Sequence, residues 1–382
     1  MIDLGKIEIE KEFDYSYWNP PITTSYEPQG DGLSTGAPIE LAKYSSMCTW
    51  QVDFGGGVVT SYFISGQTIY SYPAGTLPAN ATFELDLDAV YGMDSLITMA
   101  VGFKGVESRL CIVNGRAGTE RMIILTNDGN FTLINNVFNP SVVNDGLNNV
   151  QWDDNTEHWY ISNKYTTSSG ESRALKVSPD GDVIAILSDP PELDQLQPNC
   201  FSFIDSHTAY LTSVSRNQET WRVQKLNLDT FAMEGHYIDV RDTNLGTVPI
   251  DISNFGDILI TQYIASQNKI VIFAGGTGTF YGEYGIYEVK LIFDPVTETT
   301  EWDGEYLWAG GDAGKITYDK PSETMFIAVD FSNVVETKTL KTNSSFKFEP
   351  NDIGGVAGKG NFQGYLIDNY YRQIYVWLNT TP

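Results

Sequence analysis

The sequence predicts an all-β protein, and three observations lead to this prediction. Aromatic residues make up 13% of the 382 residues and 35 glycines interrupt the chain, a composition typical of strands separated by turns. Asp-Gly pairs stand between alternating apolar stretches, which is a strong signal of β-hairpins. One apolar strand pattern recurs seven times, and no stretch shows the period of an amphipathic helix.

The recurring unit consists of an apolar strand, a second and more apolar strand, and a hairpin. The second strand is the clearest element, and its copies are expected at Val58–Ile64, Leu96–Phe103, His158–Ser162, Ala209–Ser213, Lys269–Ala274, Thr324–Asp330 and Gln373–Leu378. Marker residues within these copies lie 36 to 61 residues apart, with a mean of about 52. Propeller blades span ~40–50 residues, so the repeat predicts a seven-bladed β-propeller.

Hairpins are expected to complete most of these units. Their bends carry Asp, Asn, Pro and Gly, the residues that tight turns require. The expected hairpins are 122–134 around Asn127-Asp128-Gly129, 174–187 around Pro179-Asp180-Gly181, 224–238 around Asp229-Thr230 and 288–302 around Asp294-Pro295.

The two ends of the chain predict how the ring closes. The last unit stops at Leu378 after two strands, whereas residues 6–13 form an alternating strand without a unit of its own. Pairing that strand with the last blade would cover an exposed sheet edge. We therefore expect residues 1–17 to close the last blade, residues 18–45 to form an extended linker, and residues 46–382 to form the propeller.

One unit carries residues found in kelch repeats. The pair Gly275-Gly276 follows an apolar strand, an aromatic residue stands at Tyr287, and Asp294-Pro295 and Trp302 follow. The chain thus resembles β-propeller repeat proteins at the level of the superfamily, with one kelch-like blade. This resemblance implies the fold and nothing about partners.

The charge of the chain disfavours nucleic acids and anionic membranes as partners. Asp and Glu number 49 against 23 Lys and Arg, which gives a formal net charge of −26. DNA, RNA and acidic lipids carry the same sign. No apolar stretch approaches the ~18 residues of a membrane span, and the N-terminus as given has no signal-peptide pattern. We expect neither nucleic-acid binding nor membrane insertion, and a basic partner fits better.

Residue types that commonly carry catalysis are sparse. The three histidines have no neighbours at metal-ligand spacing, and the three cysteines lie far apart in apolar segments, typical of buried free thiols. These residues are His158, His207, His236, Cys48, Cys111 and Cys200. No nucleotide-binding loop or nucleophile motif is present. The sequence favours a protein without catalytic residues, yet it leaves catalysis open because propeller enzymes draw residues from several blades.

Two groups of residues are candidates for binding. Aromatic side chains near glycines make adaptable binding surfaces, and the candidates are Tyr15, Tyr17, Trp18, Phe280, Tyr281 and Tyr284. Glu84, Asp86 and Asp88 alternate, so on a strand they would share one face. Three carboxylates supply hard oxygen ligands, and calcium is the cofactor they suit. A solvated strand face is the alternative, and no other cofactor is expected.

These observations favour a non-enzymatic structural or interaction propeller within a larger assembly. Propellers present flat faces and loops that suit docking, so the expected partners are other proteins of that assembly. The most specific form of this hypothesis is a virion protein of a virus or phage, associated with the tail or capsid. The alternative is a surface or secreted propeller that binds or hydrolyses glycans, for which two carboxylates would have to converge.

Overall fold

The structure is a computed structural model that describes most of the chain between Trp50 and Asn379. The described segments are 50–53, 59–65, 67–73, 82–93, 97–105, 107–114, 121–126, 131–138, 147–163, 173–188, 196–215, 220–239, 250–280, 283–309, 312–319, 324–331, 334–341, 348–350, 361–368 and 373–379.

The described strands form seven separate antiparallel sheets, six of four strands and one of two. The first three sheets are β1 (Trp50–Asp53), β2 (Val59–Ser65), β3 (Thr68–Pro73) and β4 (Thr82–Asp86); β5 (Ile97–Lys104), β6 (Glu107–Asn114), β7 (Arg121–Thr126) and β8 (Leu133–Phe138); and β9 (Leu147–Asp153), β10 (His158–Asn163), β11 (Arg173–Val177) and β12 (Val183–Ser188).

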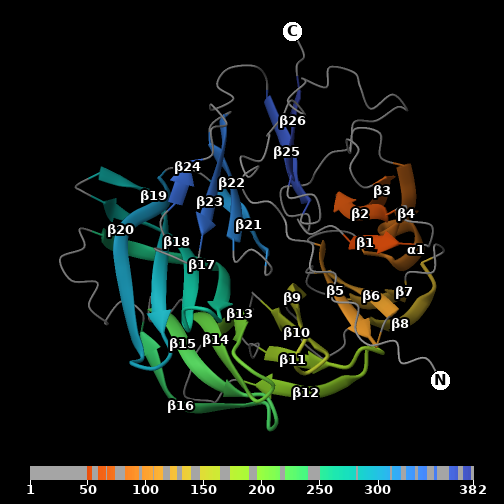
Figure 1. The fold of residues 1–382 in the computed structure, drawn as a ribbon, viewed down its shortest axis with the longest axis horizontal. Helices are drawn as coiled ribbons and strands as arrows, with labels where there is room; N and C mark the ends of the chain where they lie inside the picture. The colour runs from red at the N-terminus through yellow and green to blue at the C-terminus, as the bar shows by residue number, and fades with distance from the viewer. Residues whose placement is uncertain are drawn as a thin grey trace, which may run out of the picture.

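The other four sheets continue in the same way. They are β13 (Leu196–Phe203), β14 (Thr208–Ser215), β15 (Thr220–Asn227) and β16 (Ala232–Asp239); β17 (Ile250–Ile264), β18 (Lys269–Phe280), β19 (Glu283–Asp294) and β20 (Thr299–Ala309); β21 (Asp312–Asp319), β22 (Thr324–Phe331), β23 (Val334–Lys341) and β24 (Phe348–Pro350); and β25 (Asn361–Asp368) with β26 (Gln373–Asn379). In Figure 1 the sheets follow one another around a ring in chain order. The prediction of a largely all-β chain built from repeated units is confirmed.

One predicted second strand is wrong. Leu96–Phe103 corresponds to β5, the first strand of its sheet, and the second strand is β6. Both strands are apolar and buried, so periodicity alone does not tell one from the other. Taking Ile112 of β6 as the marker places it 49 residues after Phe63 and 48 before Tyr160, which removes the short spacing of 36 and the long one that followed it. The other six copies fall on β2, β10, β14, β18, β22 and β26.

The predicted hairpins are confirmed. They are the antiparallel pairs β7–β8, β11–β12, β15–β16 and β19–β20.

The core lies between neighbouring sheets. On β6, Leu110 and Ile112 pack toward the β1–β4 sheet, whereas Cys111 and Val113 pack toward the β9–β12 sheet. Successive strand residues point to opposite faces, so a strand between two sheets is buried on both sides. This double burial explains why the recurring strands are apolar at nearly every position.

A short helix, α1 (Leu87–Tyr91), interrupts the β structure where the sequence indicated no helix. Asp86 caps its N-terminus, because one carboxylate oxygen accepts hydrogen bonds from the amides of Asp88 at 3.0 Å and Ala89 at 2.9 Å. Gly92 ends the helix with a φ of 68°, a left-handed conformation that glycine adopts without steric cost. The helix places Leu87, which is fully buried, in the core.

The closing strand at residues 1–17 and the linker at residues 18–45 lie outside the described residues, so both stay predictions. The last sheet contains β25 and β26 in the described part of the chain, and its completion as a seventh four-stranded blade stays a prediction as well. The kelch-like residues share one sheet, with Gly275 and Gly276 in β18, Tyr287 in β19 and Trp302 in β20.

Candidate functional site

One face of the ring is built from tight turns. In an antiparallel four-stranded sheet, the first and third connections lie at the same end. In the three sheets from β9 to β20, these connections are the turns at 154–157, 178–182, 205–207, 228–231, 265–268 and 295–298. We call the surface that they form the tight-turn face.

Side chains at the ends of strands hold these turns in place. The carboxylate of Asp205 accepts hydrogen bonds from the amides of His207 and Thr208, both at 2.8 Å. Asn227 does the same for residues 229 and 230, and Asp294 for residues 296 and 297. Such side-chain turns fix the backbone locally. Part of the acidity at this face is therefore structural.

Asp153 illustrates this structural use of a carboxylate. It is 3% exposed, and it accepts hydrogen bonds from the backbone amide and side chain of both Asn155 and Thr156. A buried carboxylate with four donors is fully satisfied, so Asp153 serves the turn.

Three consecutive sheets, from β5 to β16, each reach the next one at this face. A side chain donates a hydrogen bond to a backbone carbonyl in the third connection of the following sheet. Arg109 donates to Pro179 O at 2.9 Å, Lys176 to Leu228 O at 2.8 Å and Tyr210 to Pro295 O at 3.3 Å. We call these contacts forward latches. They join consecutive sheets in the direction of the chain.

A phenyl ring closes two junctions between sheets, and one of these two junctions also has a latch. Phe131 and Phe231 both lie near the end of the third connection of their sheets, and both have a positive φ, 51° and 48°. Phe131 contacts Tyr62 of the preceding sheet with ring centroids 5.3 Å apart, and Phe231 contacts Tyr160 at 5.9 Å. Both phenylalanines are buried. We call each of them a phenyl plug.

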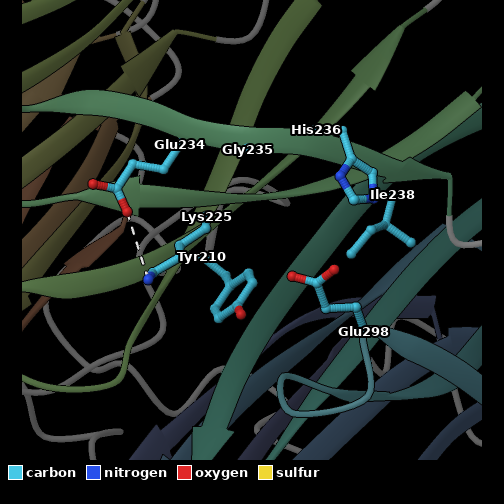
Figure 2. Close-up of a pocket in the computed structure, with 7 residues that line it drawn as sticks. All are labelled: Tyr210, Lys225, Glu234, Gly235, His236, Ile238 and Glu298. Carbon is cyan, nitrogen blue, oxygen red and sulfur yellow. Dashed lines mark ion pairs between the residues drawn. The ribbon is translucent and has the colours of Figure 1, made fainter.

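Glu298 occupies the matching position at the next junction. It ends the 295–298 turn with a φ of 53°, and the tyrosine of the preceding sheet is Tyr210 in β14. Glu298 is exposed. A pocket of about 250 Å³ opens here, where the phenyl plug stands at the other two junctions. Its lining residues are Tyr210, Lys225, Glu234, Gly235, His236, Ile238 and Glu298 (Figure 2).

The pocket has an apolar floor and charged walls. Tyr210 and Ile238 are 5% and 8% exposed, and they form the floor. Lys225 and Glu234 form an ion pair at 3.5 Å on one side. Figure 2 shows the Glu298 carboxylate on the other side, between the Tyr210 ring and His236 in this view.

The titration of two groups reflects this charge distribution. A hydrogen bond from Asn227, at 2.8 Å, and the neighbouring Lys225 lower the pKa of Glu234. Burial raises the pKa of Tyr210, and the charges of Glu298 and Asp294 raise it further. Glu234 is thus held ionised, and the negative charge around Tyr210 disfavours a phenolate.

The structure tests the predicted aromatic candidates only in part. Phe280 ends β18 and Tyr284 lies near the start of β19, so both belong to the end of one long hairpin. Tyr15, Tyr17, Trp18 and Tyr281 lie outside the described residues. Their role in binding stays a prediction.

The predicted arrangement of the three carboxylates is wrong. Glu84 and Asp86 lie in β4, but Asp88 lies in helix α1, so the three do not share a strand face. Glu84 accepts a hydrogen bond from the Ser71 hydroxyl, and Asp86 caps the helix. Within the described residues, no group of three or more His, Cys, Asp and Glu side chains is arranged to hold a metal ion. Calcium binding itself stays a prediction.

The pocket residues did not emerge from the sequence. His236 stands in the sequence as one of three histidines without neighbours at metal-ligand spacing, and Glu298 belongs to no motif. The signal that could have identified Glu298 is the alignment of the third connections, where it falls opposite Phe131 and Phe231. The two expected buried thiols within the described residues, Cys111 and Cys200, are free and buried.

The chain is similar in fold to several solved structures of low sequence identity. The chain is similar to Kuenenia stuttgartiensis hydrazine synthase, with a TM-score of 0.54 and 12% identity over 90% of this chain and 98% of that one. It is also similar to the Dos1 propeller, with a TM-score of 0.48 and 7% identity over 85% and 74%. For the β-propeller domain of the Trilobed protease from Pyrococcus furiosus, the TM-score is 0.42 and the identity is 10% over 84% and 87%.

Identities this low show the fold alone. The ring of separate antiparallel sheets, six of them four-stranded in the described residues, defines the chain as a β-propeller whose sheets are its blades (Figure 1). No known sequence family matches the chain, and no curated protein is similar to it in sequence. In the described part of the chain, no helix has the length and apolar character needed to cross a membrane.

Proposed function

We propose that this β-propeller is a non-catalytic interaction module that binds protein partners within a larger assembly. The observation that carries the proposal is the tight-turn face, a surface of short hydrogen-bonded turns with exposed carboxylates. Asp154, Glu157, Asp182, Asp205 and Asp229 are all exposed there.

The build of this face suits docking. The short turns are held by side-chain hydrogen bonds, and forward latches join them. We expect them to change little on binding, so little conformational entropy is lost when a partner docks. Exposed charges on such a surface steer encounter and set specificity. A net charge of −26 makes a basic protein surface the complementary partner.

The narrower form of the proposal is a virion component of a virus or phage, associated with the tail or capsid. An acidic, rigid ring that docks by one face meets the needs of a repeated particle. The docking surface supports this narrower proposal, and the experiment below tests whether the protein belongs to a particle.

The test is the mass of the native complex at two salt concentrations. The tagged protein is isolated from its source at about 50 mM and about 500 mM salt, and the intact mass is measured by native mass spectrometry. We expect a defined complex at low salt that is weaker at high salt, because exposed charge pairs are screened. Electron microscopy of the same fraction tests for particles.

Two results would overturn the proposal. One is a single chain at both salt concentrations. The other is turnover of a glycan substrate by the purified protein, which would favour the glycan-processing alternative.

A further inference from the structure

Three junctions between blades, each with a tyrosine in the second strand of the preceding blade, can be compared near the end of the third connection. Phe131 and Phe231 fill this position in two of them, each against a tyrosine of the preceding blade. At the third junction the tyrosine is kept as Tyr210, and Glu298 takes the place of the ring. The position that seals the other two junctions is here open and negatively charged.

We propose that the pocket between Tyr210 and Glu298 receives a basic side chain, arginine in preference to lysine, from a protein partner. This inference rests on the proposed function, since it names the chemistry by which the propeller engages its partner. Without a partner the pocket is open, and with one it holds the cation where the other two junctions hold a phenyl ring.

The charges in the pocket leave one carboxylate for a ligand. Glu234 already pairs with Lys225 at 3.5 Å and accepts a hydrogen bond from Asn227 at 2.8 Å. Glu298 forms neither a hydrogen bond nor an ion pair with the described residues. Two carboxylates against one ammonium give the walls an excess of negative charge. A guanidinium that enters the pocket therefore meets Glu298 as its counter-ion.

The floor favours a guanidinium over an ammonium. The Tyr210 hydroxyl is engaged with Pro295 O at 3.3 Å, so Tyr210 contributes its ring to the pocket and not a free hydroxyl. Ile238 adds apolar surface beside it. A planar, weakly hydrated guanidinium stacks on aromatic rings, whereas an ammonium stays strongly hydrated. A volume of about 250 Å³ matches a single side chain rather than a larger ligand.

Glu298 is held in position before any ligand arrives. Its turn begins at Asp294, which accepts the amides of Val296 at 2.8 Å and Thr297 at 3.4 Å and pairs with Lys269. The left-handed φ of Glu298 recurs at Phe131, Glu157, Phe231 and Asn268, so it belongs to the turn geometry and is not strain reserved for one site. A carboxylate on such a turn binds a cation with little loss of backbone entropy.

The test uses a defined probe and one reporter in the pocket. The full chain, carrying ¹³C-methyl isoleucine, is titrated with the tripeptide acetyl-Gly-Arg-Gly-amide. We expect saturable shifts of the Ile238 methyl signals with a Kd in the millimolar range, typical of a single side chain. Ile64, which is buried in β2, is the reference and should not move. The lysine peptide should bind more weakly, and the neutral citrulline peptide should not bind.

Two isosteric variants distinguish a local contact in the pocket from the attraction of the negatively charged face as a whole. Glu298→Gln should weaken binding about tenfold, because a charge-assisted contact is lost. Glu157→Gln is the matched control, since Glu157 is also exposed and also ends a turn of this face with a φ of 54°. It should change the affinity by less than about twofold.

The outcomes also separate this inference from the proposed function. Equal losses in both variants, equal binding of citrulline, or no saturable shift would overturn the pocket as the arginine site. If the Glu298→Gln protein fails to bind the probe but still forms the native complex unchanged, the inference fails and the proposed function stands. If the probe binds and no native complex exists, both the proposed function and the protein partner are overturned.

Discussion

Two neighbouring junctions of this propeller use the same backbone plan with different side chains. Between the β9–β12 and β13–β16 blades, Lys176 latches onto Leu228 O and Phe231 plugs the gap beside Tyr160. Between the β13–β16 and β17–β20 blades, the lysine partner of Tyr210 turns instead to Glu234.

The latch at this second junction passes to the tyrosine hydroxyl, and Glu298 replaces the plug. The latch is present at both junctions, whereas the phenyl ring is present at only one of them. A donor to the turn carbonyl is present at both junctions, because a buried carbonyl without a partner is costly. The ring below it is dispensable at one of them. A binding pocket can thus arise by substitution at one turn position.

The comparison predicts its largest effect at the phenyl plug. Phe231→Ala should lower the free energy of unfolding by about 3 kcal/mol, because it leaves a cavity beside Tyr160 in a buried cluster. Glu298→Ala, at the matching position, should change it by less than about 0.5 kcal/mol, since an exposed side chain is removed. Chemical denaturation of both variants provides the measurement. Equal losses in the two variants would contradict the claim that the phenyl ring stabilises its junction and Glu298 does not.

A third junction, between the β5–β8 and β9–β12 blades, relies on charge. Asp180 pairs with Lys104 and Arg109, and hydrogen bonds from these two side chains lower the pKa of Asp180. A carboxyl group whose pKa is lower in the folded state stabilises the protein above its unfolded pKa. That contribution disappears as the pH falls through the folded value.

Asp180→Asn should therefore lower Tm by about 2 °C at pH 7, a modest effect because Asp180 is partly exposed. The difference from the unmodified protein should shrink as the pH falls from about 4 toward 2, where the unmodified carboxyl is protonated as well. Thermal melts across this range test it. A difference in Tm that does not depend on pH would contradict the ionic origin.

The smallest expected effect runs in the opposite direction. Glu298→Phe should restore the plug and raise the free energy of unfolding by about 1 kcal/mol, the usual gain from filling a cavity. Glu157→Phe is the control, since Glu157 is also exposed and also ends a turn of this face with a φ of 54°, and it should bring no gain. A loss of stability in Glu298→Phe would mean that the pocket cannot accommodate a ring.

The fold could be predicted from the sequence because its signals are local and repeated. Segments such as 158–162 and 209–213 are buried on both faces and therefore apolar throughout, which makes them visible as repeats. The same property caused the error at 96–103, because two adjacent strands of that blade are equally apolar. Asp86 and Asp88 were misread because a helix begins between them, and a cap acts through backbone geometry that alternation does not reveal.

The candidate site was beyond sequence reasoning for a different reason. Tyr210 and Glu298 are separated by more than one repeat in sequence, and they meet only because consecutive blades stand side by side. Neither residue belongs to a motif. The pocket exists because Glu298 stands where two other junctions have a phenyl ring. This difference can be recognised only once Phe131 and Phe231 are known to occupy equivalent positions.

The forward latches also limit how early during synthesis neighbouring blades can be joined. In each latch the acceptor carbonyl is synthesised after the donor side chain. The acceptor follows Arg109 by 70 residues, Lys176 by 52 and Tyr210 by 85. At ~5–20 residues per second on the ribosome, these partners emerge roughly 3 to 17 seconds after the donor. During synthesis each of these three junctions therefore stays unlatched until most of the following blade has emerged.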